Sequence, residues 1–198
     1  MGRLLVKQAE SLGNEDVRQR LDLYRKAIEV NANDRLAKIA LTKIIIAGGE
    51  DAEAASEIYN PQTDHRRPPR QACMMLAEDA MNNGNPKEVI KNLERIHSLD
   101  QQQKIMYCRA SLELDATQAQ RALEILRSRR ANPIDDELKK WQGLLLVKVG
   151  TYGEAFDLLK SCLEKDPNDE QSKAAIKKCL KELGRKSEEY RKTLSSDK

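Results

Sequence analysis

Histidine and cysteine are the side chains of this sequence best suited to metal binding or catalysis, and they are few and scattered. His65 and His97 each lack a second ligand three or four residues away, so we expect surface residues rather than a metal site or an acid–base pair. No CxxC pair occurs, and each cysteine falls on an apolar helical face. These cysteines are Cys73, Cys108, Cys162 and Cys179. We therefore expect buried, reduced thiols rather than disulfides or a nucleophile.

Motifs that bind phosphate groups or nucleotide cofactors are missing from the sequence. Neither GxxxxGK[ST] nor GxGxxG occurs, and Gly48-Gly49 is better explained as a turn between helices. The sequence therefore predicts a protein that is not an enzyme and that uses no cofactor and no metal.

Two basic clusters could meet an anionic partner. The segment HRRPPR contains Arg66, Arg67 and Arg70, and Arg127–Arg130 lies late in an expected helix, where cations favourably face the helix C-terminus. Solvated side chains explain both clusters, and binding to an acidic protein or to RNA is the alternative. No aromatic residues interleave with them to stack bases. Because 35 basic and 32 acidic residues leave a net charge of only +3, we expect nucleic-acid binding to be the weaker hypothesis.

An apolar pattern that returns every 33 to 35 residues organises the elements that would position any site. Its markers are Ile58, Leu93, Leu126 and Leu159, and a small or apolar residue precedes each by four positions: Ala54, Val89, Ala122 and Ala155. A period of this length is typical of stacked pairs of helices.

Residues 136–169 form the clearest unit of the pattern. Gly150 is expected to end a first helix, and Thr151 with Glu154 predicts a capping box at the start of a second. Asp166 and Pro167 then predict a closing turn.

We therefore expect an all-α fold, a right-handed superhelix of about five antiparallel helix pairs with a C-terminal capping helix. The expected units of the array over 1–169 are 1–34, 35–68, 70–100, 101–135 and 136–169. The capping helix is expected over 170–194, with a frayed tail over 195–198. On it, Ile176, Leu180 and Leu183 predict an apolar stripe, and Gly184 predicts a bend or an end.

This pattern resembles the tetratricopeptide repeat, a helix-turn-helix unit of 34 residues. The residues that carry the resemblance are Gly143, Gly150, Tyr152, Ala155 and Pro167, where that repeat has Gly, Gly, Tyr, Ala and Pro. The resemblance covers residues 70–169 well and 1–69 loosely. It implies the fold and a protein-binding role, and it leaves the ligand open.

The run from Ala155 to Tyr190 is similar to the last repeat and tail of immunophilin-type co-chaperones. That resemblance implies a Lys/Arg clamp for a chaperone's C-terminal carboxylate on the stretch Glu137 to Gly143. Glu137 and Trp141 or Gln142 stand where the clamp has Lys and Arg, and an acidic side chain there disfavours a carboxylate ligand.

Placing the repeats in phase sends six side chains toward the concave groove that the first helices would line. They are Lys43, Met74, Glu78, Arg109, Lys140 and Lys148. We expect a non-enzymatic scaffold or adaptor that binds a peptide or helical segment of another protein there, with a co-chaperone role as one form of it. The first alternative is a structural subunit packed permanently into a complex by its convex face or terminal helix, which exposed apolar residues on second helices would favour. RNA binding through 65–70 and Arg127–Arg130 is the weaker alternative.

The chain opens with MGRLLV and has no long apolar run. We expect neither a signal peptide nor membrane insertion, and therefore a cytoplasmic location, with the nucleus as the other option.

Overall fold

The computed structural model describes residues 1–13, 16–63, 68–127 and 136–196, and within them it is all-α, with eleven helices and no strand. The expected all-α class is confirmed at this level. The chain divides into two compact units, Met1–Ser98 (unit 1) and Leu99–Lys198 (unit 2).

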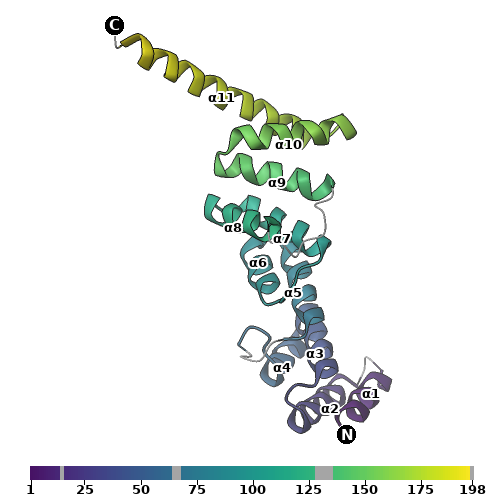
Figure 1. Ribbon diagram of the computed structural model, residues 1–198. Coiled ribbons are helices and arrows are strands. Elements are labelled where there is room, and N and C mark those ends of the chain that lie inside the picture. Colours follow the sequence, from purple (N-terminus) through teal and green to yellow (C-terminus); the bar gives the residue numbers. More distant parts are fainter. Residues whose placement is uncertain (14–15, 64–67, 128–135, 197–198) are drawn as a thin grey trace. The chain divides into compact units, whose positions relative to one another are not determined.

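Unit 1 holds six helices that pack as three consecutive pairs. They are α1 (Gly2–Ser11), α2 (Val17–Val30), α3 (Arg35–Ala47), α4 (Glu50–Ile58), α5 (Arg70–Asn82) and α6 (Pro86–Glu94). α1 packs on α2, α3 on α4, and α5 on α6 (Figure 1). α3 also contacts α1 and α5, so the first helices of successive pairs are neighbours.

Unit 2 holds five helices, and each of them packs on the next one along the chain. They are α7 (Gln101–Glu113), α8 (Ala116–Arg127), α9 (Asp136–Val149), α10 (Tyr152–Lys165) and α11 (Glu170–Ser196). α9 packs on α7, α8 and α10, and α11 covers α10, so α9, α10 and α11 follow one another as layers in Figure 1.

Turns and caps explain most of the helix boundaries. Gly48 and Gly49 adopt φ values of 76° and 82°, which side chains disfavour, and they separate α3 from α4 as predicted. Asn85 caps α6 by accepting the amide of Glu88, with Pro86 at the first helical position.

The capping box that the sequence predicts at Thr151 and Glu154 is wrong. The Thr151 side chain makes no capping hydrogen bond, although α10 does begin at the next residue. A capping box is found instead at α7, where Asp100 accepts the amide of Gln103 and the Gln103 side chain accepts the amide of Asp100. Asp and Gln can form the same reciprocal hydrogen bonds as Thr and Glu. Residue type alone therefore did not predict which helix start has the capping box.

Small side chains allow the helices to approach closely. Residues with no exposed surface include Ala9, Ala27, Ala37, Ala55, Ala72, Ala77, Ala110, Ala119, Ala122 and Ala155. The tightest approach is at Gly143 of α9, where an added Cβ would lie 2.7 Å from Cγ of Leu159 on α10. Because Leu159 is fully buried, its side chain has no free space to move into.

The C-terminal helix differs from its prediction in two respects. Its buried face is Ser172, Ala175 and Cys179, while Leu180 and Leu183 of the predicted stripe are 54% and 37% exposed. Helix periodicity does not decide between two adjacent apolar stripes, and the smaller side chains fit closer against α10. The helix also does not end at Gly184; it reaches Ser196, and 197–198 lie outside the described residues.

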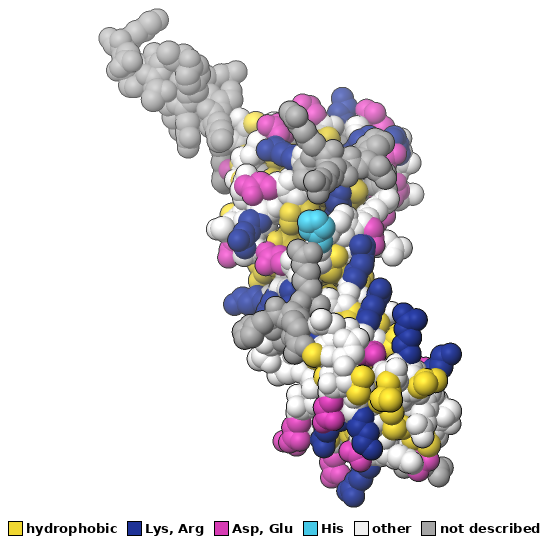
Figure 2. Space-filling view, turned by 60° about the horizontal axis from the view of Figure 1, so that its bottom comes forward, with side chains coloured by type: hydrophobic (Ala, Val, Ile, Leu, Met, Phe, Trp, Pro, Cys, Tyr) yellow, Lys and Arg dark blue, Asp and Glu magenta, His cyan; other side chains and the backbone are white. Residues whose placement is uncertain are grey.

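Large apolar side chains that remain exposed are concentrated in one place. Among the described residues, six are exposed, and four of these belong to unit 1: Met1, Leu4, Val30 and Leu36. Figure 2 shows hydrophobic side chains gathered in the lower part of the view, with Lys and Arg side chains beside them.

We expect Gly143→Ala to lower the free energy of unfolding by about 1–2 kcal/mol, because the clash with Leu159 outweighs the better helix propensity of alanine. Urea unfolding followed by circular dichroism measures the change. Gly153→Ala on α10 is the matched control. A Cβ there meets nothing within 4 Å, so stability should rise by up to about 1 kcal/mol. Equal effects of the two substitutions would contradict the packing argument.

Candidate functional site

The predicted groove residues lie on first helices that are neighbours within each unit. α3 contacts α5 in unit 1, and α7 contacts α9 in unit 2. The six residues therefore form two groups, one on each pair of helices. Lys43, Met74 and Glu78 belong to unit 1, and Arg109, Lys140 and Lys148 belong to unit 2.

Lys43 is exposed and lines a cleft of about 330 Å³ between the first four helices. The cleft wall carries both signs of charge, with Glu10 and Asp51 opposite in sign to Lys43 and Arg20. Ile44 and Tyr24 supply apolar surface to the same cleft. Lys43 can therefore meet a ligand beside apolar surface in a mixed electrostatic environment.

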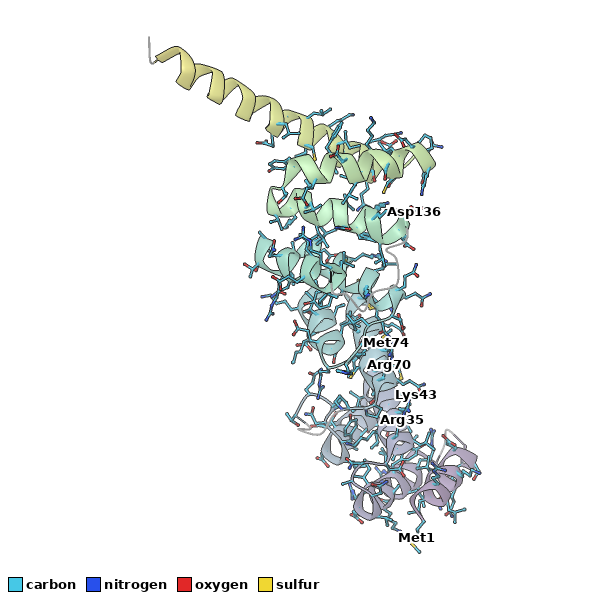
Figure 3. All side chains as sticks on the ribbon, in the orientation of Figure 1. Met1, Arg35, Lys43, Arg70, Met74 and Asp136 are labelled. Atoms are coloured by element: carbon cyan, nitrogen blue, oxygen red, sulfur yellow. The ribbon has the colours of Figure 1, made fainter. Side chains whose placement is uncertain are left out.

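Met74 and Glu78 lie one turn apart on α5, which is the first helix of the next pair and contacts α3. Met74 is half-buried and Glu78 is exposed. Figure 3 shows Lys43, Arg70 and Met74 in succession along α3 and α5. These residues therefore lie on two helices that contact each other.

Trp141 lies beside two cations of the unit 2 group, although it was not among the predicted groove residues. The Cζ atom of Arg109, from α7, lies 6.0 Å from the ring centroid, and Nζ of Lys140 lies 5.8 Å from it. Cation–π contacts at this distance contribute about 0.5–1 kcal/mol when partly exposed. Nε1 of Trp141 is buried and makes no hydrogen bond to any described residue.

Lys140 is held by an ion pair rather than projecting freely. Its Nζ lies 2.9 Å from the carboxylate of Asp169, and the two side chains are only 26% and 12% exposed. Ser172 also donates to Asp169, at 2.6 Å. Burial would raise the pKa of Asp169, but the hydrogen bonds from Ser172 and Lys140 outweigh burial, so that pKa lies below its ordinary value.

Lys148 is likewise engaged within unit 2. Its Nζ donates to the backbone carbonyl of Leu112, at 3.0 Å, and so joins the end of α9 to the last turn of α7. A lysine near a helix C-terminus satisfies a carbonyl that has no partner inside its own helix. Of the three predicted cations of unit 2, Arg109 is therefore the one that keeps an exposed side chain without such a bond.

The repeat period of the sequence could have predicted the contacts of Lys148 and Trp141. Lys148 and Leu112 are 36 residues apart, and Arg109 and Trp141 are separated by about one repeat as well. Residues one period apart on neighbouring first helices come within side-chain reach.

The remaining charged candidates are only partly described. Arg70 begins α5 and is exposed, whereas Arg66, Arg67 and His65 lie outside the described residues. Arg127 lies 3.5 Å from Glu154 in an exposed ion pair, and the rest of its basic cluster is also outside. His97 is exposed, as expected for a surface residue.

All four cysteines are buried, as the sequence predicted. Burial raises the pKa of Cys108 to about 12, and it also raises the pKa of Cys73, Cys162 and Cys179. A nucleophilic cysteine needs the opposite shift, because the thiolate is the reactive form. These thiols therefore act as small apolar side chains in the core.

The described part of the chain contains neither a metal-binding cluster nor a membrane span. No group of three or more His, Cys, Asp or Glu side chains there could hold a metal ion. No helix there combines the length and the apolar composition needed to cross a bilayer.

Comparison with known proteins adds no relative. No protein-family model matches the chain, and a search of curated proteins found no match either.

We expect Asp169→Asn to lower the free energy of unfolding by about 1 kcal/mol at pH 7, because Lys140 loses a charge-assisted partner. The folded-state pKa of Asp169 is depressed, so its stabilisation is complete above the unfolded pKa of about 3.9 and disappears as the pH falls through the folded value. The difference between wild type and variant should therefore shrink below pH 4.

Urea unfolding at pH 7 and at pH 3 measures this dependence. Asp157→Asn on α10 is the control, because Asp157 is exposed and should change stability by less than about 0.5 kcal/mol. A difference between Asp169→Asn and wild type that stays constant with pH would contradict the role given to the ion pair.

Proposed function

We propose that this chain is a non-enzymatic scaffold or adaptor that binds a peptide or helical segment of another protein along its first helices. The observation that carries the proposal is the packing of first helices side by side, α3 with α5 and α7 with α9. That packing gives each unit a continuous face made from different repeats. Extended surfaces of this kind are what helical repeat proteins use for recognition.

The exposed side chains of these two faces, α3 with α5 in unit 1 and α7 with α9 in unit 2, suit a partner with both apolar and acidic residues, and we call the two together the first-helix face. Arg109 and Trp141 form a platform of flat, amphipathic surface, and tryptophan and arginine are enriched among residues that dominate binding energy. In unit 1, Met74 adds a half-buried apolar surface and Lys43 a cation. Apolar contact would supply most of the affinity, and the cations would select the partner and its register.

The kinship with tetratricopeptide repeats is part of the proposal. It is supported by Gly143, whose missing side chain admits Leu159, and by Gly150, whose φ of 90° closes the turn between α9 and α10. A carboxylate clamp is not part of it, because Glu137 is exposed on the first turn of α9, where a ligand carboxylate would be repelled. A cytoplasmic or nuclear location would keep the buried thiols reduced.

A structural subunit is the second candidate, and the exposed leucines of α11 favour it. Leu180 and Leu183 of the terminal helix are 54% and 37% exposed. Among the second helices α2, α4, α6, α8 and α10, only α2 exposes a large apolar side chain in its described part, Val30. Light scattering after size exclusion should show association that Leu180→Gln with Leu183→Gln abolishes, if α11 is the permanent interface.

We expect Lys43→Glu combined with Arg109→Glu to abolish capture of the proteins that bind the first-helix face. Reversing two exposed cations leaves the Lys140 and Lys148 contacts intact, so the fold should be retained. Affinity capture from native lysate with quantitative mass spectrometry compares wild type and variant. Loss of specific partners by at least about tenfold is expected for two reversed interface charges.

Lys87→Glu combined with Lys160→Glu provides the matched control. Both lysines are exposed and lie on the second helices α6 and α10, so the net charge changes equally while the first-helix face is untouched. Partners retained equally by both variants would contradict the proposed face.

Trp141 is the single tryptophan of the chain, and its fluorescence emission should shift when a captured segment binds to unit 2.

A further inference from the structure

A second surface of unit 1 combines exposed apolar residues with unpaired cations. It is a groove of about 940 Å³ formed by the start of α1, the end of α2, the start of α3 and Gln71 of α5. It shares no lining residue with the cleft at Lys43. We refer to it as the terminal groove.

The apolar part of the terminal groove is unusually exposed. Met1 is 89% exposed, Leu4 72%, Val30 55% and Leu36 45%, and Ile39 adds a buried apolar side chain to the lining. Covering such side chains gains about 25 cal/mol per Å² of apolar surface, so a contiguous group of them marks an interaction site.

The charged part of the groove is almost entirely basic. Arg3, Lys7 and Arg35 line it, and no hydrogen bond or ion pair joins these three side chains to another described residue. Its one acidic residue, Asp34, is 6% exposed, and its carboxylate already accepts the amides of Leu36 and Ala37 as the cap of α3. The groove therefore presents three available cations and no available carboxylate.

We propose that the terminal groove binds an acidic segment of a partner protein whose apolar side chains insert beside Leu4 and Leu36. Charge complementarity selects this occupant, because carboxylates flanking the apolar anchors would pair with Arg3, Lys7 and Arg35. A second copy of the chain placing the same groove against itself would bring like charges together. A flat anionic membrane would leave the recessed part of the groove unfilled.

The test is selection of phage-displayed random 16-residue peptides against the full chain, followed by fluorescence anisotropy with labelled selected peptides. We expect the selected peptides to carry spaced apolar residues with Asp or Glu around them. Leu4→Gln with Leu36→Gln, and separately Arg3→Glu with Arg35→Glu, should each weaken their binding at least about tenfold. Added salt should weaken binding to wild type.

The matched control is Leu180→Gln with Leu183→Gln, which removes two exposed leucines elsewhere and should leave peptide binding unchanged. All these side chains are exposed, so melting curves should coincide. Basic or uncharged selected peptides, failure to select any, or binding indifferent to the groove variants would overturn the proposal. So would dimerisation, or sedimentation with phosphatidylserine vesicles, that is lost in Leu4→Gln with Leu36→Gln. The first-helix face can fail its own test without affecting this one.

Discussion

Close approach between helices is the constraint on which the rest of this structure depends. A chain with one Phe and one Trp has few large side chains with which to fill a core, and its interior is built largely from alanine and leucine. Gly143 shows the limit of this packing, because even a methyl group there would overlap Leu159. Small residues at the crossings bring neighbouring first helices side by side within each unit.

Neighbouring first helices create surfaces, but contacts within a unit also engage some of the side chains that the sequence predicts to recognise a partner. Within unit 2, Lys140 pairs with Asp169, the residue directly before α11, and Lys148 donates to the carbonyl of Leu112 on α7. Both contacts join helices of successive repeats, and Lys140, which is only 26% exposed, also needs its partner because of its burial. Arg109, which faces Trp141, and Lys43, in its cleft, keep exposed side chains.

Two kinds of surface result from the same architecture. The first-helix face mixes charges of both signs with a few apolar contacts, which suits selective and reversible recognition. The terminal groove in unit 1 joins exposed apolar side chains to cations alone. The difference arises because the start of α1, the end of α2 and the start of α3 leave large apolar side chains exposed, whereas the first-helix face has none that is fully exposed among its predicted residues.

The sequence by itself determined the helical class, the repeat period, the glycine turns and the burial of the cysteines, because these follow from local periodicity and backbone preference. The prediction of Thr151 as a capping side chain is wrong. Of the predicted α11 stripe, Ile176 is half-buried, but Leu180 and Leu183 are exposed while Ser172, Ala175 and Cys179 are buried. Only tertiary structure decided these points and the partners of Lys140 and Trp141. Which of two adjacent faces packs, and which charge finds a partner, depends on the neighbouring helix rather than on the residue's own position in the chain.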